Sequence, residues 1–252
     1  METKQTFFSS LNSRNSLLFG VAGGVLVICV IGLIVFVSLY FSRGDDSSTA
    51  STTANIANSA QLATSNVAKS DKPIVELFVM SYCPYGLQME SAYLPVMKLL
   101  GKKADIKIKF VSYAMHGAKE SDENNRQYCI QKEQNDKFLT YMNCFLSNQD
   151  YKTCVSSAGV NSTQLSTCVT KMEKDYNTID GYPAYTVDQA LNDKYVVEGS
   201  PTLVINGTTV NNVNRTPEDV KQAVCAAFKT QPSECNTILD STGATASGDC
   251  EV

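Results

Sequence analysis

The sequence predicts an α/β domain with an all-helical insertion, preceded by a single transmembrane helix and a flexible stalk. Three observations lead to this fold class. An uncharged apolar segment covers residues 16–41, and a strand–helix–strand pattern begins at Pro73. Residues 121–185 have helical patterns and no strand signal, and a hairpin and a last helix follow them.

The apolar segment 16–41 is long enough to cross a bilayer as a helix, which takes about 20 residues. A cleaved signal peptide is the alternative, but its apolar stretch would be shorter and would end in small residues. Here the segment ends in Tyr40 and Phe41, and Ser42 and Arg43 follow it, which favours an uncleaved anchor. Lys4 and Arg14 precede it, so residues 1–15 are expected to be a short cytoplasmic tail.

The cysteines indicate an oxidising compartment for the rest of the chain. Cys29 lies in the apolar segment, and the other eight of the nine cysteines follow it. We therefore expect a single-pass membrane protein that contacts the bilayer through one helix and has its C-terminal domain outside the cytoplasm. A zinc site is the competing reading, but the sequence has no Cys-x-x-Cys pair and one histidine, so we expect no metal and no cofactor. A net charge of −4 without a basic stripe gives no support for nucleic-acid binding.

Residues 42–72 are rich in Ser, Thr and Ala and have few large apolar residues, which is typical of a flexible stalk. The folded domain is expected over 73–240. It opens with a short apolar run, 74–80, typical of a strand that is buried on both faces. The Ser/Thr/Gly-rich residues 241–252 are expected to be disordered.

A helical pattern follows the first strand, with apolar residues at 89, 93, 96 and 100 and with Pro95 inside it. Residues 105–110 then alternate between apolar and lysine side chains, which predicts a strand. A strand–helix–strand unit predicts a right-handed crossover between parallel strands.

Capping residues mark the later helices. Ser121 is expected to open one helix of the insertion and Asn161 another. A short helix is predicted over 186–195, and a hairpin turns at Asn206-Gly207 after the strand 202–205. The last helix is expected to start at Thr216 and Pro217.

Cys83 carries the clearest chemical signal because it lies between the first strand and the first helix. Unpaired amides and the positive end of the helix dipole stabilise a thiolate at that position. The alternative is a buried structural cysteine or a disulfide partner. Pro84 argues against this alternative, since a proline at the start of a helix indicates an open, exposed helix end.

Two motifs resemble the thioredoxin superfamily. Ser81-Tyr82-Cys83-Pro84-Tyr85-Gly86 is similar to the redox loop of glutaredoxin-like and DsbA-type members, and Gly199-Ser200-Pro201-Thr202 is similar to their cis-proline loop. The resemblance covers about 73–228, with 121–185 as a DsbA-type helical insertion. It implies a thioredoxin-like fold in which Cys83 attacks disulfides and the Ser200-Pro201-Thr202 segment binds the substrate backbone. It also implies cysteine-containing client proteins and a separate thiol redox partner.

One position departs from this pattern. Family oxidoreductases carry a second cysteine three residues after the first, and this chain has Gly86 there. A lone thiol stops at the mixed disulfide until another thiol releases it. Isomerase-like or monothiol exchange therefore stays open, as does a cycle that a distant cysteine resolves, for which Cys250 is the candidate.

His116 follows the second predicted strand, whose end should lie at the same edge of the sheet as Cys83. A nearby imidazole can stabilise the thiolate or transfer a proton. A surface histidine that does neither is the alternative.

A second, weaker resemblance concerns the C-terminal half. Its cysteines and the 200–206 run are similar to the luminal domain of plant vacuolar sorting receptors, which bind cargo. The function expected first is thiol–disulfide exchange on extracytoplasmic proteins. The second is a redox-inactive domain that holds a peptide or protein. The third is a monothiol iron–sulfur carrier, which would need a cytosolic domain.

The spacing of the remaining cysteines suggests structural disulfides. If the insertion folds back as two antiparallel helices that turn near Asn148, then Cys144 meets Cys154 and Cys129 meets Cys168. Four cysteines allow three connectivities, so a Cys129–Cys144 bond would contradict this arrangement. Cys225 and Cys235 would tie the last helix to the segment after it.

Overall fold

The computed structural model describes residues 66–176 and 184–245. The predicted transmembrane helix 16–41, most of the predicted stalk and Cys250 lie outside these residues. Among the helices that are described, none is both long and apolar enough to cross a membrane.

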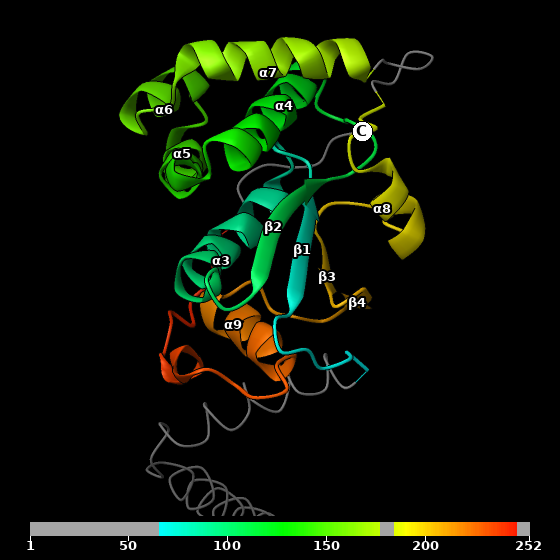
Figure 1. Ribbon diagram of the computed structural model, residues 1–252, viewed down its shortest axis with the longest axis vertical. Helices are drawn as coiled ribbons and strands as arrows, with labels where there is room; N and C mark the ends of the chain where they lie inside the picture. The colour runs from blue at the N-terminus through cyan, green and yellow to red at the C-terminus, as the bar shows by residue number, and fades with distance from the viewer. Residues whose placement is uncertain (1–65, 177–183, 246–252) are drawn as a thin grey trace, which may run out of the picture. The chain divides into compact units, whose positions relative to one another are not determined.

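A four-stranded sheet forms the centre of the described domain, with the order β2-β1-β3-β4 (Figure 1). The strands are β1 (Ile74–Val79), β2 (Asp105–Phe110), β3 (Thr202–Ile205) and β4 (Thr208–Val210). β1 pairs in parallel with β2, as the strand–helix–strand pattern predicted, and antiparallel with β3. β3 and β4 form the predicted hairpin, in which Asn206 and Gly207 both have positive φ.

The alternation of side chains along β1 gives the sheet a core on each face. Val75, Leu77 and Val79 belong to the main core, together with the inward residues of β2. Phe78 and Met80 point the other way, into a smaller cluster that also contains Cys83. The first strand is therefore buried on both faces, as its apolar run predicted.

Two helices that are far apart in the sequence pack together beside the main core. They are α3 (Pro84–Leu100) and α9 (Pro217–Ala226). The buried Tyr93 fixes α3 to the sheet, because its hydroxyl lies 3.0 Å from the carbonyl oxygens of both Val75 and Lys107. α9 begins as predicted, with the Thr216 side chain accepting a hydrogen bond from the backbone N–H of Asp219.

The short helix α8 (Gln189–Tyr195) borders the smaller cluster and is tied to the end of β2. The Asp188 carboxylate accepts a hydrogen bond of 3.1 Å from the backbone N–H of Phe110, and Asn192 donates one of 2.9 Å to the Phe110 carbonyl. These two side chains satisfy backbone groups on the outer edge of β2, where no further strand is bound among the described residues.

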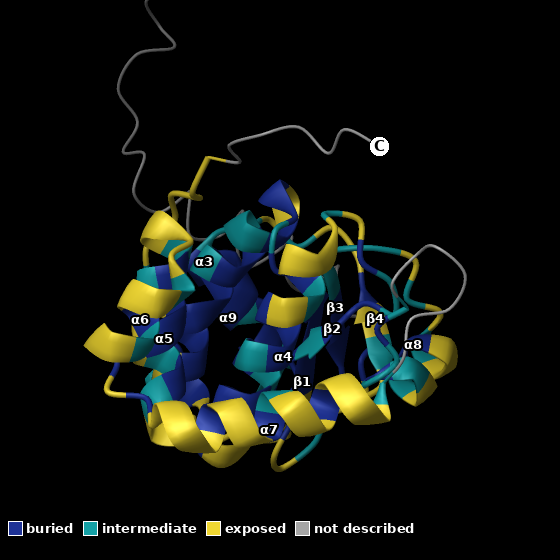
Figure 2. Ribbon diagram, turned by 90° about the horizontal axis from the view of Figure 1, so that it is seen from above, coloured by how far each residue is buried: buried dark blue, intermediate teal, exposed yellow. Residues whose placement is uncertain are grey.

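The described part of the insertion is helical, as predicted, but it has four helices and not two long ones. They are α4 (Ala118–Glu133), α5 (Asn135–Asn148), α6 (Tyr151–Ser157) and α7 (Ser162–Asp175). They gather at one end of the sheet (Figure 1), and α7 is exposed on its outer side (Figure 2). Asn161 caps α7 as predicted, since its side chain accepts from the N–H of Gln164. Ser121 does not open a helix: it lies inside α4, which begins after Gly117 at a φ of 74°.

Three disulfides hold the described residues together: Cys129–Cys168, Cys144–Cys154 and Cys225–Cys235. They join α4 to α7, α5 to α6, and α9 to the 3₁₀ turn at Ser233–Asn236. These are the pairs expected from the spacing. The Cys129–Cys168 bond closes a loop of 39 residues, so it should stabilise the fold by about 4 kcal/mol in the chain-entropy model.

The packed domain extends beyond the expected boundaries at both ends. Before Pro73, Val67 is buried and Ser70 exchanges backbone hydrogen bonds with Ala227 and Lys229. After Asp240, the Ala244 carbonyl accepts a hydrogen bond from Gln88 on α3. Both segments are polar in sequence. Long-range backbone bonds hold the first in place, and a side-chain bond from Gln88 holds the second.

The strand order, the parallel crossover and the antiparallel hairpin confirm the thioredoxin-like fold with a helical insertion. The Ser200–Pro201 peptide bond before β3 is cis, as the resemblance implied.

Candidate thiol site

Cys83 lies where the sequence predicted, between β1 and α3. It is the N-cap residue of α3, and Pro84 takes the first helical position. The Cys83 carbonyl accepts from the N–H of Leu87 at 2.9 Å, and its own N–H donates to Met80 at 3.0 Å. No side chain caps the first turn of α3. Its amides can therefore act on the charge of the thiol.

The thiol itself is buried, which corrects the expectation of an open, exposed helix end. Cys83 is only 4% exposed, and its Sγ donates to the Ser200 carbonyl oxygen at 3.6 Å. Met80 and Val204 pack in the same apolar cluster. Ser200 and Val204 are far from Cys83 in sequence, so the helix-start proline gave no indication of this cover.

Ser200 and Gly86 fit against each other directly beside Cys83. The Ser200 Oγ accepts a hydrogen bond of 3.0 Å from the N–H of Met80 at the end of β1. A Cβ added to Gly86 would lie 2.6 Å from that Oγ, 3.2 Å from the Met80 carbonyl oxygen and 3.4 Å from the Cβ of Cys83. The space of a second active-site cysteine is thus occupied by the serine hydroxyl. The close packing of Ser200 requires a residue without a side chain at position 86. Gly86 therefore has a structural role in addition to the absence of a second thiol.

Tyr113 is a site residue that the sequence analysis missed. Its hydroxyl donates a hydrogen bond of 2.6 Å to the carbonyl oxygen of Glu198, and so holds the start of the cis-proline loop. Burial, and after it the negative charge of Cys83, raises the pKa of Tyr113. Tyr113 follows β2 by a few residues, at the sheet edge where His116 was expected to act. This position is the sequence feature from which Tyr113 could have been predicted as a site residue.

His116 is tied to the insertion. Its Nδ1 is within hydrogen-bond distance of the buried Glu120 carboxylate, whose other oxygen accepts from the N–H of Met115. The Glu120 carbonyl in turn accepts from Ser81 Oγ, two residues before Cys83. His116 thus supports the active-site loop through Glu120. Within the described ranges, no group of three His, Cys, Asp or Glu side chains could bind a metal ion.

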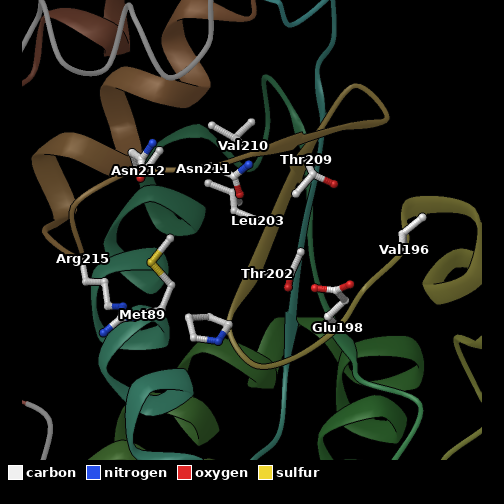
Figure 3. Close-up of a pocket in the computed structure, with 12 residues that line it drawn as sticks. Met89, Val196, Glu198, Thr202, Leu203, Thr209, Val210, Asn211, Asn212 and Arg215 are labelled. Atoms are coloured by element: carbon white, nitrogen blue, oxygen red, sulfur yellow. The ribbon is translucent and has the colours of Figure 1, made fainter.

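A cavity of about 270 Å³ lies beside the cis-proline. Pro201, Thr202 and Met89 contribute to its wall, and the charged side chains of Arg215 and Glu198 come from opposite sides of it (Figure 3). The exposed Tyr85 of the active-site loop lies under Arg215, whose guanidinium carbon is 5.0 Å from the ring centre. The wall of the cavity comes from α3, from the cis-proline loop and from the segment after β4, and its volume can hold one or two side chains of a polypeptide.

Two buried carboxyl groups lie on α3 and α4, those of Glu90 and Glu123. Glu90 is fully buried, and neither of its carboxyl oxygens has a hydrogen-bond partner among the described residues. Burial, and after it the charge of Glu123, raises the pKa of Glu90 well above its ordinary range. Glu123 is held by Arg126 Nε at 2.7 Å and by the Tyr141 hydroxyl at 2.7 Å. Burial raises the pKa of Glu123 as well, while the charge and hydrogen bond of Arg126 and the hydrogen bond of Tyr141 oppose this shift.

No family model matches this sequence, and no curated protein matches it. Solved structures do resemble the fold. The reduced disulfide bond oxidoreductase DsbG from Mycobacterium tuberculosis has 16% identity and a TM-score of 0.49, over 68% of this chain and 89% of that one. DsbA from Mycobacterium tuberculosis has 16% identity and a TM-score of 0.48, over 68% and 94%. Oxidised BdbD from Bacillus subtilis has 18% identity and a TM-score of 0.45, over 63% and 89%.

The fit between Gly86 and Ser200 predicts a strong coupling between the two positions. Gly86→Ala should destabilise the domain, because the new Cβ displaces the Ser200 hydroxyl from Met80. In a Ser200→Ala background the same change should lose most of its cost, since alanine is favoured over glycine in a helix by about 0.5–1 kcal/mol. Urea unfolding of the four proteins gives the coupling energy. Equal effects of Gly86→Ala in both backgrounds would contradict the fit.

The raised pKa of Glu90 predicts a pH-dependent stability. The folded state holds the Glu90 proton, whereas the unfolded chain releases it above about pH 4.3. The contribution of this group is therefore fully present below that pH and is lost as the pH rises towards the folded pKa. Glu90→Gln keeps the neutral shape, so its stability relative to the native protein should rise between pH 4 and pH 8. Urea unfolding at both pH values measures this. A difference that is the same at both pH values, as expected for the exposed control Glu133→Gln, would count against it.

Proposed function

We propose that this chain is a membrane-anchored thiol–disulfide exchange protein that acts on extracytoplasmic client proteins, with Cys83 as the nucleophile. One observation carries the proposal. The Cys83 thiol is the N-cap residue of α3 and also touches the Ser200–cis-Pro201 loop. This brings a sulfur and a set of helix amides together beside the cis-proline loop, and Pro201 of that loop lines the cavity.

The reaction begins when the Cys83 thiol, which donates to the Ser200 carbonyl in this structure, loses its proton to solvent. The amides of the first turn of α3 stabilise the thiolate. The thiolate attacks one sulfur of a client disulfide, a new S–S bond forms, and the other client sulfur leaves as a thiolate. The client chain lies in the cavity against Pro201, where Arg215 and Glu198 offer both signs of charge.

The arrangement at Gly86 sets the mode of exchange. Position 86 is a glycine that fits against Ser200, so it has no thiol that could resolve the mixed disulfide. The proposal is therefore isomerase-like or monothiol exchange, in which a second thiol of the client, or a separate redox partner, completes the cycle.

A redox-inactive module that binds a peptide or a protein is the second candidate. The cavity beside Pro201 and the burial of Cys83 favour it. It needs the groove but no reaction at the sulfur, so a test of the sulfur separates the two functions.

The location outside the cytoplasm is part of the proposal, and the three disulfides of the described domain support it, since such bonds persist in oxidising compartments. Residues 16–41 would then span the lipid bilayer as a helix. Protease added to intact cells or spheroplasts should remove the domain after residue 72. Full protection until the membrane is permeabilised would contradict this orientation.

The reaction itself is tested by trapping. Purified protein incubated with a disulfide-containing client, such as insulin, should form mixed disulfides at Cys83 that are visible on non-reducing gels. Cys83→Ser should abolish them without unfolding the domain, because the hydroxyl is nearly isosteric and far less nucleophilic. The double variant Gly86→Cys/Ser200→Ala should gain catalytic turnover in insulin reduction, whereas Gly86→Cys alone should gain less because its Cβ meets Ser200.

If the native protein forms no client adducts, the exchange function is wrong and the peptide-binding module takes its place. Circular dichroism of Cys83→Ser, matched to the native protein, excludes misfolding as the cause of any loss.

A further inference from the structure

Arg215 is a cation at the cavity beside the cis-proline, and its partner there is a neutral side chain. The described residues contain two arginines, and they are held in different ways. Arg126 pairs with the buried carboxylate of Glu123 at 2.7 Å. Arg215 instead donates to the amide oxygen of Gln88 at 2.9 Å, and no ion pair among the described residues includes it. The amide fixes the guanidinium without neutralising its charge.

The carboxylates that follow Arg215 in the sequence make other contacts. Glu218 and Asp219 lie in the first turn of α9. Glu218 pairs with the buried Lys221 at 2.8 Å, and the Asp219 carboxylate accepts a hydrogen bond of 2.8 Å from the Thr216 hydroxyl. Both acidic groups therefore stabilise the start of α9, and the charge of Arg215 stays available to a ligand in the cavity.

Arg215 is held against the end of α3 that Cys83 caps. Gln88 is itself fixed, because its Nε2 donates to the Ala244 carbonyl at 2.5 Å. The guanidinium carbon also lies 5.0 Å from the ring centre of Tyr85, a favourable contact between a cation and an aromatic face. Tyr85 and Gln88 follow Cys83 by two and five residues. The cation therefore has a defined position next to the active-site loop.

The second charged side chain of the cavity has the opposite sign. Glu198 lies on the other side of the cavity from Arg215 (Figure 3). The rest of the lining is neutral and includes the polar side chains of Thr209, Asn211 and Asn212. A bound chain thus meets a positive end and a negative end. Complementary charges favour one placement of a charged ligand and like charges disfavour the other.

The position of Arg215 fits an extended client that reacts at Cys83. Gln88 lies about 7.5 Å along the axis of α3 from Cys83. An extended chain rises about 3.3 Å per residue, so a side chain about two or three positions from the reacting cysteine comes level with Arg215. A guanidinium can give a carboxylate two parallel N–H bonds. Arg215 is also half-buried, and an ion pair is stronger there than on an open surface.

We propose that Arg215 is a specificity-determining residue that selects clients with an Asp or Glu side chain near the reacting cysteine, on one side of it only. The proposal rests on the exchange function of Cys83 and names its substrate class, which is an acidic polypeptide segment. Glu198 disfavours a carboxylate at the other end of the cavity, so the two charges together set the placement of the client.

The experiment uses the full chain in detergent and short peptides whose one cysteine carries thionitrobenzoate. Attack of the Cys83 thiolate on the cysteine sulfur forms a protein–peptide disulfide and releases thionitrobenzoate as a coloured thiolate. The peptides have glutamate or lysine two positions before or two positions after the cysteine, and their ends are acetylated and amidated so that they carry no charge. The rate with Cys83→Ser is subtracted as the contribution of other thiols.

In one of the two placements, the native protein should react faster with glutamate than with lysine by about threefold to fivefold, as a partly exposed ion pair gives. Added salt should reduce this ratio. Arg215→Gln should remove it, and Arg215→Glu should reverse it. Lys229→Gln makes the same charge change at an exposed lysine outside the cavity and should keep the native ratio. Because the ratio is taken within one protein, a change in the reactivity of the thiol itself cancels.

The outcomes separate the failure of this inference from that of the exchange function. If the four peptides react equally with the native protein, or if Arg215→Gln keeps the ratio, Cys83 reacts but Arg215 does not select the client. If no peptide reacts faster than with Cys83→Ser, the exchange function is wrong. Binding of the same peptides, with serine in place of cysteine, to Cys83→Ser is then measured by fluorescence anisotropy. Tighter binding of glutamate in one placement would support the role of Arg215, and equal affinities would overturn it.

Discussion

The hydrogen bond from the Met80 N–H to the Ser200 hydroxyl is the contact on which the rest of the site depends. It joins the end of β1 to the loop before β3 across 120 residues. The same loop presents its carbonyl to Cys83 and its proline to the cavity. Gly86 is fitted to the hydroxyl, and Tyr113 holds the loop from the other side. The geometry of the thiol is thus set by a loop far from it in sequence.

Local signals in the sequence were enough to predict much of the fold. The alternation in 105–110, the Asn206-Gly207 turn and the Thr216-Pro217 start each depend on residues within a few positions, and each element forms where it was predicted. Ser121 failed as a helix start because α4 already begins after Gly117, whose φ of 74° suits glycine. Glu120, Glu123 and Gln127 are buried on this helix, which its polar sequence did not indicate.

The features of the site also fall into those that local sequence predicts and those that it does not. The two motifs and the parallel pairing of β1 with β2 could be predicted, since each depends on consecutive residues, and the cis-proline followed from the resemblance. The burial of Cys83, the role of Tyr113 and the packing of Ser200 against Gly86 could not, because each depends on how distant segments meet. Glu90 belongs to this second class, since a glutamate in a helix reads as a surface residue until its neighbours are known.

The long separation between Met80 and Ser200 also bears on how the molecule folds. β1 acquires its antiparallel neighbour only after the whole insertion and α8 have been made, because β3 starts at Thr202. Contacts of such high sequence separation close large loops and form late compared with helices. During synthesis, a nascent chain therefore carries Cys83 without the loop that covers it, beside cysteines that have yet to pair. The order in which thiols become shielded is built into the topology, and Cys83 is among the last.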